Sequence, residues 1–283
     1  MSKRVDALTN YINYGLKKLE KDGAVVGISG GLDSAVVLRL CQRAIGNGKI
    51  RAIALPEFDS DPESVRLAKE LCAGLSFEVI NIGPVLKKLG IYRYFHPMVF
   101  SLHLPYRIKK NYVHRISPSL KGRLYLKFLR DDLPEDLKKI KPYLRIKNRI
   151  RMTILYQKAE ELNYGVVGTI NRTEYLLGFF VPFGDGSADI MPLIDLYKTE
   201  VRELALELKI PPAILNRKPS PDLIPGLGDE EIIGLKYERI DTILKKIVAG
   251  ERTTGEERYI KEVYEAAASI RRLIAPKPEK IFK

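Results

Sequence analysis

The stretch Ser29-Gly30-Gly31-Leu32-Asp33-Ser34 decides the fold. It follows a short apolar run at residues 24–28 and precedes a longer apolar segment that begins at Ala35. The first run is typical of a buried strand and the second of a helix, so the six residues between them form a strand–turn–helix connection. In an α/β sheet, anions bind at this position, where the carboxyl end of a strand faces a helix N-terminus.

The residue types in this turn suit a polyphosphate. Gly30 and Gly31 allow close backbone approach, so several N–H groups can converge on one phosphate, and Ser29 and Ser34 add hydroxyl donors. Asp33 would repel a bare phosphate, so we expect a divalent cation between its carboxylate and the phosphates. The alternative is a tight turn in which a Ser or Asp only caps the helix.

The rest of the chain predicts an α/β fold: a Rossmann-like parallel sheet flanked by helices. Strand and helix patterns alternate along the sequence without hairpin signals. Strands are predicted at residues 51–55, 77–82 and 165–169, and helices at 5–19, 62–73, 146–162 and 199–208. We expect one domain over 1–283, with a helical C-terminal part at about 229–275 and an insertion at about 90–143. The insertion has no clear period, and we predict some helix in it near 120–129 and 135–140.

Composition limits the class of partner. The formal net charge of +13 favours anionic partners such as nucleotides or nucleic acid, although a charge-rich, thermophile-like surface would explain it equally well. No apolar run is long enough to span a bilayer and no signal peptide is seen, so we expect a cytoplasmic protein without a membrane partner. Cys41 and Cys72 lack metal spacing and are expected to be buried thiols.

A second group of strings follows the fourth predicted strand. Gly168-Thr169-Ile170-Asn171-Arg172-Thr173-Glu174 comes first, then a glycine-rich run at 178–189, Lys198-Thr199 and Lys218-Pro219-Ser220. The six-residue turn itself matches the SGG-x-DS pyrophosphate loop of N-type ATP pyrophosphatases. In this order, the strings resemble the ammonia-dependent NAD synthetase family over most of the chain.

The resemblance implies a fold of the adenine nucleotide alpha hydrolase-like kind and a ligase reaction. In that reaction, ATP drives the amidation of nicotinate adenine dinucleotide to NAD with ammonia. An acyl-adenylate forms on the way, and AMP and pyrophosphate are released. The family also implies Mg²⁺ and a homodimer with the dinucleotide bound across the interface. No glutaminase string is seen, so free ammonia is the expected nitrogen donor.

Residue roles follow from the same resemblance. Asp33 and Glu174 are the expected Mg²⁺ ligands, and Asp33 and Lys198 the expected catalytic residues. ATP is expected to contact Ser29, Gly30, Gly31, Asp33, Ser34, Thr169, Lys198 and Ser220. The dinucleotide is expected to contact Arg149, Asp185 and Asp189.

Plainer interpretations of these residues stay open. Glu174 could be a helix cap, Lys198 an exposed first-turn lysine and Ser220 a turn residue. Asp185, Asp189 and Arg149 could simply be solvated.

The sequence departs from the family strings at the end that recognises the acid. Arg145 stands where the family has an Asn, Ile270-Arg271-Arg272 replaces HKR, and Phe180-Val181-Pro182 replaces F-T-K. An alternative function is therefore an N-type ATP pyrophosphatase that adenylates another carboxylate or a tRNA base. A regulator that only binds adenine nucleotides is a third possibility, which the set of Asp33, Glu174 and Lys198 disfavours.

The insertion interleaves aromatic and basic residues, a pattern that can bind nucleic acid, although a lid or a dimer contact is the favoured interpretation. The residues concerned are Tyr92, Arg93, Tyr94, Tyr106, Arg107, Lys109, Lys110, Tyr112, His114 and Arg115.

Overall fold

The computed structural model describes residues 2–94, 104–120, 124–220 and 224–274. Within these ranges it contains a parallel sheet of four strands in the order β3-β2-β1-β4. The strands are β1 (Gly23–Gly27), β2 (Ile50–Ala54), β3 (Ser76–Val79) and β4 (Tyr164–Val167). The predicted α/β class is thus confirmed, with each strand within a few residues of its expected position.

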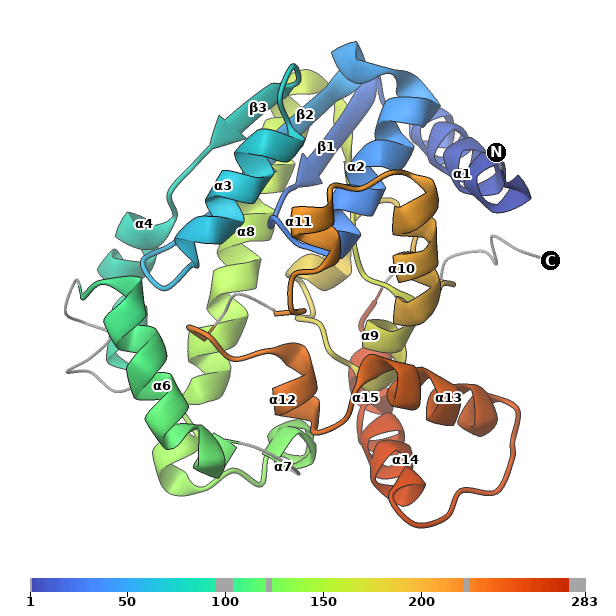
Figure 1. The fold of residues 1–283 in the computed structure, drawn as a ribbon. Helices are drawn as coiled ribbons and strands as arrows, with labels where there is room; N and C mark the ends of the chain where they lie inside the picture. Colours follow the sequence, from blue (N-terminus) through green and yellow to red (C-terminus); the bar gives the residue numbers. More distant parts are fainter. Residues whose placement is uncertain (1, 95–103, 121–123, 221–223, 275–283) are drawn as a thin grey trace.

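Two helical layers cover the sheet, because successive side chains of a strand point to opposite faces. Ala24, Val26 and Ala52 share one core with α1 (Lys3–Lys18), α2 (Leu32–Ile45), α3 (Pro62–Leu71) and α10 (Lys198–Glu207). Val25, Ile53 and Val166 share the opposite core with the long helix α8 (Ile140–Leu162). Figure 1 shows α2 and α8 on either side of the strands.

The strand order creates a crevice beside β1. The chain runs from β1 through α2, β2 and α3 to β3, moving towards one edge, whereas β4 returns to the other side of β1. The connections after β1 and β4 therefore diverge, and such a switch point is where open α/β sheets bind ligands. In Figure 1, β1 points towards the middle of the molecule, where α11 (Pro212–Leu215) and α12 (Asp229–Ile233) lie.

The insertion is more helical than its sequence predicts. It contains a 3-10 helix at Ile91–Arg93, α6 (Tyr106–Leu120), α7 (Leu124–Arg130) and a 3-10 helix at Glu135–Leu137, and α4 (Gly83–Lys88) precedes it. The predicted helix at 120–129 corresponds to α7 in part, and residues 121–123 lie outside the described residues. The expected helix at 135–140 forms in part, as a 3-10 helix at Glu135–Leu137, and α8 begins at Ile140.

A buried ion cluster fastens the insertion to the sheet. Lys109 of α6 donates to Asp59 Oδ1 at 2.6 Å, and Lys147 of α8 donates to Glu57 Oε1 at 2.7 Å. Both acids lie in the loop after β2, and all four side chains are almost completely shielded from solvent. The Tyr143 hydroxyl also donates to Asp59 Oδ2, at 2.5 Å. Buried charges persist only when they are paired and hydrogen-bonded in this way.

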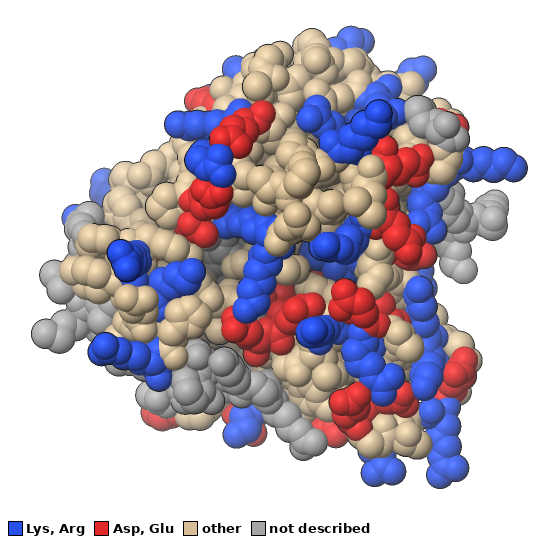
Figure 2. Space-filling view, in the orientation of Figure 1, with Lys and Arg blue, Asp and Glu red and all other residues tan. Residues whose placement is uncertain are grey.

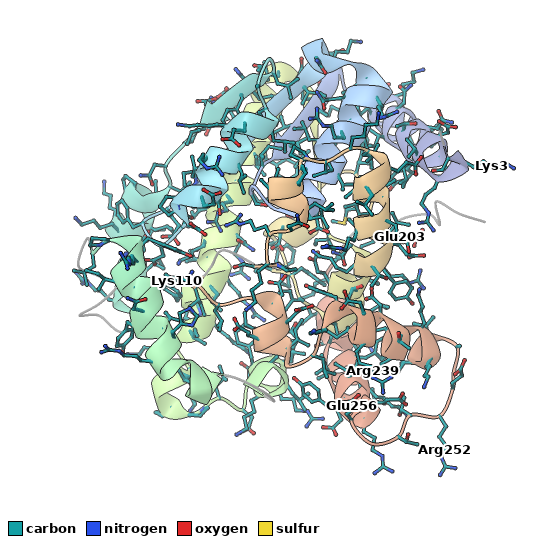
Figure 3. The ribbon with its side chains drawn as sticks, in the orientation of Figure 1. Lys3, Lys110, Glu203, Arg239, Arg252 and Glu256 are labelled. Atoms are coloured by element: carbon teal, nitrogen blue, oxygen red, sulfur yellow. The ribbon has the colours of Figure 1, made fainter. Side chains whose placement is uncertain are left out.

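The C-terminal part forms a helical layer of its own. It comprises α12, α13 (Tyr237–Val248), α14 (Glu257–Ala266) and α15 (Ala268–Arg271), which pack against α7 and α9 (Arg172–Leu177). Arg239 of α13 pairs with Glu256 at 2.8 Å, and Figure 3 labels both residues.

Two further expectations concern the cysteines and the membrane. Cys41 and Cys72 are buried and unbridged, as predicted. Among the described residues, the search for a helix both long and apolar enough to cross a bilayer gives none.

Candidate active site

The turn after β1 is held in shape by its own serines. The Ser34 hydroxyl donates to the Gly31 carbonyl at 3.0 Å and accepts from the Ser29 N–H at 3.3 Å. The Gly31 N–H donates to Ser29 Oγ at 3.2 Å. Gly30 has a φ of +72°, and a Cβ there would lie 2.3 Å from the Ser64 carbonyl oxygen, so only glycine fits. The loop is therefore rigid before any ligand binds.

Asp33, Glu174 and Lys198 meet at the open side of this turn, although they come from three separate segments. The Lys198 ammonium lies 2.5 Å from Asp33 Oδ2 and 3.5 Å from Glu174 Oε1. Asn171 also donates to Asp33, at 3.0 Å from its Oδ1. The two carboxylates that the sequence predicts as metal ligands are thus brought together, with a lysine ammonium between them.

Glu174 serves the helix cap and the site at once. Its Oε2 accepts from the Asn171 N–H at 3.2 Å, while Asn171 Oδ1 accepts from the Glu174 N–H at 3.0 Å, which makes a capping box at the start of α9. Its Oε1 faces Lys198. The cap fixes the rotamer, so the second oxygen is held towards Lys198.

Asp241, for which the sequence predicts no role, helps to position Lys198. The Lys198 N–H donates to Thr173 Oγ1 at 2.9 Å, and Thr173 in turn donates to Asp241 Oδ1 at 2.5 Å. Asp241 Oδ2 accepts from the Thr199 N–H at 2.9 Å. Asp241 of α13 therefore binds the first turn of α10, from which the Lys198 side chain reaches the cavity. Lys198 is buried, so the exposed-lysine interpretation is wrong.

These residues line a cavity of about 280 Å³, called here the main cavity. It extends from the turn after β1, past the carboxyl ends of the strands, to α11 and α12. The predicted residues that line it are Ser29, Gly31, Asp33, Ser34, Thr169, Glu174, Asp185, Lys198 and Ser220.

Three predicted residues stand apart from the cavity lining. Gly30 turns the backbone behind the loop, and its carbonyl accepts from Arg217 at 3.2 Å. Arg149 donates to the Pro182 carbonyl at 3.3 Å. Asp189 accepts from the Tyr156 hydroxyl at 2.9 Å and from the Val166 N–H at 2.8 Å. With both oxygens engaged, Asp189 fastens β4 to the segment after it.

Among the cavity residues outside the predicted set are Arg151, Arg217 and Asp229. Arg151 lines the cavity and donates to the Leu55 carbonyl at 3.0 Å. Arg217 lines it and holds Ser64 and Asp61, at 2.7 and 3.1 Å. Asp229 is 4% exposed, and its Oδ1 has no hydrogen-bond partner among the described residues. Its string, Gly228-Asp229-Glu230, follows the others in order along the chain, and the structure buries Gly228 and Asp229 while Glu230 is half-buried.

Burial and charge shift the ionisation of this group. Burial raises the pKa of Glu174 to about 8, even though Lys198 works in the opposite direction. Burial likewise raises the pKa of Asp229 to about 6. For Lys198, burial alone would lower the pKa, but Asp33 and Glu174 outweigh it and raise the pKa above its ordinary value. Three carboxylates, Asp33, Glu174 and Asp229, thus act on the single ammonium of Lys198 in a poorly solvated space, which favours binding of an added cation beside them.

The carboxylates of Asp33 and Glu174 are of the kind that bind a divalent cation. Within the described ranges, no three Cys, His, Asp or Glu side chains converge as a complete metal site. Asp33 and Glu174 offer two carboxylates beside a phosphate-binding turn, and Mg²⁺ is commonly held by one or two carboxylates together with substrate phosphates. The residues thus fit a cation that arrives with a polyphosphate, and they do not form a preassembled cage.

A second, apolar cavity of about 140 Å³ adjoins the first. The two share Asn148, Phe179 and Asp185, and the insertion contributes Tyr125 and Phe128 to the wall. Arg145 also lines the apolar cavity, with its guanidinium 5.6 Å from the centre of the Phe128 ring.

Asp185 accepts from Asn148 and from the Val181 N–H, both at 3.0 Å, and burial raises its pKa. Asp185 is thus an ordered part of the wall, not a solvated loop acid.

The basic insertion residues do not act alike. Lys109 is 1% exposed and paired with Asp59, so it is unavailable to a nucleic acid. Tyr92 is buried too and donates to Glu57 Oε2 at 2.7 Å. On the face shown in Figure 2, Lys and Arg side chains are scattered among Asp and Glu side chains. This face therefore offers no broad surface of one charge to a nucleic acid.

Comparison with known proteins gives a consistent result. The NAD synthase family model matches residues 4–95 and 132–275. The NH(3)-dependent NAD(+) synthetase of Thermotoga maritima is 42% identical over 94% of this chain and 96% of its own length. The NMN synthetase structure from Francisella tularensis is 25% identical with a TM-score of 0.72, covering 98% of both chains. An NH3-dependent NAD synthetase structure from Campylobacter jejuni has a TM-score of 0.65 at 23% identity, covering 99% of this chain and 98% of its own.

Proposed function

This chain belongs to the NAD synthase family, and we propose that its main cavity binds ATP for the adenylation of a substrate carboxylate. The reaction is ammonia-dependent NAD synthesis, in which a ligase forms a C–N bond and ATP is a substrate. One observation supports the assignment of the site above all. Asp33, Glu174 and Lys198 converge beside a serine- and glycine-lined turn at the switch point of the sheet.

In the first step, the turn from Ser29 to Ser34 holds the β- and γ-phosphates, which leave as pyrophosphate. The substrate carboxylate attacks the α-phosphorus, and the bond to the leaving pyrophosphate breaks. Lys198 stabilises the negative charge that builds up on the phosphate oxygens in this transition state. Asp33 and Glu174 would hold Mg²⁺, which would supply further charge neutralisation when bound. Positioning and electrostatics account for the acceleration, since no side-chain nucleophile is required.

In the second step, ammonia attacks the acyl carbon of the acyl-adenylate, and AMP leaves. The acyl group must then lie where the main and apolar cavities meet, close to Asn148, Phe179 and Asp185. The apolar cavity on one side of this boundary limits the access of water to the activated acyl carbon. Exclusion of water favours amide formation over hydrolysis of the intermediate.

Two related acids are candidate substrates for the apolar cavity. Nicotinate adenine dinucleotide is the acid that the family and curated relatives imply. Nicotinate mononucleotide is the second candidate, because the similar Francisella tularensis structure is an NMN synthetase. The apolar cavity can accept an aromatic ring in either case, and Arg145 offers a cation for an anionic group. We also propose that Ser220 and Thr169 contact the nucleotide, that Arg149 and Asp189 support the acid-binding region, and that the enzyme is a cytoplasmic homodimer.

An end-point assay tests this proposal. The purified protein is incubated with ATP, Mg²⁺, ammonium and either nicotinate adenine dinucleotide or nicotinate mononucleotide. We expect AMP, pyrophosphate and one equivalent of the amide to form together, and only with ammonium present. AMP formation that required added RNA would instead support the adenylation of a tRNA base. ATP binding without turnover on either acid would contradict the enzymatic assignment.

A further inference from the structure

Lys198 occupies the place where a divalent cation would bind. Its ammonium is 2.5 Å from Asp33 Oδ2 and 3.5 Å from Glu174 Oε1, and its side chain is 8% exposed. Mg²⁺ binds a carboxylate oxygen at roughly 2.0–2.1 Å, so it would lie within a few ångströms of this ammonium. Two cations at that separation in a poorly solvated space repel each other strongly. Lys198 cannot keep both contacts once a divalent cation has bound.

A displaced ammonium needs a new acceptor, because a buried unpaired charge is costly. Asp229 provides one. It lines the same cavity, it is 4% exposed, and its Oδ1 is a buried oxygen with no partner in the described part of the chain.

Tyr237 connects the two side chains. The Lys198 ammonium lies 5.2 Å from the centre of the Tyr237 ring, and the hydroxyl of the same ring donates to Asp229 Oδ2 at 2.9 Å. The hydroxyl bond orients the carboxylate and leaves Oδ1 without a donor. The aromatic face gives the ammonium a favourable surface beside its present position.

We propose that Lys198 is an internal counter-ion for Asp33 and Glu174, and that Asp229 is the positioning residue that receives its ammonium when a divalent cation enters. The proposal rests on the proposed role of Asp33 and Glu174 as cation ligands. In the cation-free state, Lys198 neutralises the two carboxylates. In the cation-bound state, Asp229 holds Lys198 beside the phosphates, so that one lysine serves both states.

The test measures Mn²⁺ binding by the EPR signal of the free ion, without nucleotide and without turnover. Lys198→Met, which keeps the length and removes the charge, is expected to bind Mn²⁺ at least about tenfold more tightly than the unchanged protein, because a competing cation is gone. Asp229→Asn is expected to bind Mn²⁺ more weakly. The double variant is the critical one: the effect of Asp229→Asn should largely disappear when residue 198 is Met, since no ammonium then needs an acceptor.

Two controls separate this proposal from general electrostatics and from misfolding. Glu230→Gln removes the charge of the acid next to Asp229. The new side chain keeps an oxygen that can accept from the Tyr237 N–H, as Glu230 does. This variant should leave the Mn²⁺ affinity nearly unchanged. The rise in Tm on adding Mn²⁺ should be larger for Lys198→Met than for the unchanged protein. A cooperative unfolding transition in the same experiment establishes that the variant folds. If Lys198→Met does not fold, Lys198→Gln takes its place in the test.

The outcomes are distinct. Equal or weaker Mn²⁺ binding by Lys198→Met, or an Asp229→Asn effect that persists in the double variant, would overturn the proposal. If the unchanged protein failed to bind Mn²⁺ even with the α,β-methylene analogue of ATP, the cation site in the proposed function would fail as well.

Discussion

Asp33 divides its two carboxylate oxygens between Asn171 and Lys198, so that a small substitution there should affect chemistry and not fold. We predict that Asp33→Asn lowers the rate of AMP and pyrophosphate formation by at least about 100-fold, the scale of losing one group aimed at developing charge. The assay is release of pyrophosphate from ATP in the presence of both acids and ammonium. Thermal unfolding and circular dichroism should show an intact fold. Turnover near that of the unchanged protein would remove Asp33 from the cation site.

Gly30 allows a test of backbone conformation in the same turn. A Cβ at Gly30 would lie 2.3 Å from the Ser64 carbonyl oxygen, in addition to its φ of +72°. Gly46 has a φ of +75° with nothing within 4 Å, so it isolates the cost of the backbone conformation alone. We predict that Gly46→Ala costs about 1 kcal/mol and that Gly30→Ala costs roughly 2 kcal/mol more. Urea unfolding measures both, and equal losses would show that the clash is relieved easily.

At the scale of elements, the contact between the insertion and the sheet depends on Asp59. Its carboxylate accepts from Lys109 and Tyr143 and lies 3.3 Å from the Lys147 ammonium, all without access to solvent. We predict that Asp59→Asn lowers the free energy of unfolding by about 3–5 kcal/mol, because it removes the carboxylate that pairs with the buried Lys109 ammonium. Chemical denaturation is the measurement.

The matched control for Asp59 is Glu135→Gln, which breaks an exposed pair with Lys138 in the same insertion. Exposed pairs contribute little, so this variant should unfold at the same denaturant concentration as the unchanged protein. A similar small effect from Asp59→Asn would mean that the buried cluster is not what holds the insertion in place.

The same cluster explains which elements sequence patterns could predict. The apolar runs at 24–28 and 51–55 predict β1 and β2 because both faces of these strands are buried. Helix α6 escapes prediction, since one of its most buried side chains is Lys109, which a hydrophobic pattern counts as polar. Helix α8 begins earlier than predicted for a related reason: its buried first turns contain Lys147 and Tyr143, and Pro142 lies in the first turn, where a helix tolerates it.

For the whole molecule, the two cysteines report on global unfolding. Both lie in the core on the α2 side of the sheet, and burial raises the pKa of each thiol to about 12. We predict that neither thiol reacts measurably with a disulfide reagent in the native protein at neutral pH, because almost no thiolate is present or accessible. In denaturant, both thiols should react, at the rate of unfolding. Rapid reaction under native conditions would show that this core opens locally.

The candidate site could be predicted only where function leaves a local string. The turn from Ser29 to Ser34, Glu174 and Lys198 follow strands or begin helices, and the structure brings them to one cavity. Asp229 belongs to one more string that resembles the family, Gly228-Asp229-Glu230, although its acidic turn has the sequence context of a solvated surface. Asp241 belongs to no such string and lies within an amphipathic helix. Only the packing of the C-terminal helices against α9 and α10 makes them part of the site.

The central claim is that the glycine-lined turn after β1 binds the triphosphate of ATP. A crystal structure of the protein grown with Mg²⁺ and the α,β-methylene analogue of ATP tests it most directly. We predict phosphate oxygens at the N–H groups of the turn and the Ser34 hydroxyl, with the cation between phosphates, Asp33 and Glu174. An occupied nucleotide site elsewhere in the molecule, with this turn binding no phosphate, would contradict the account.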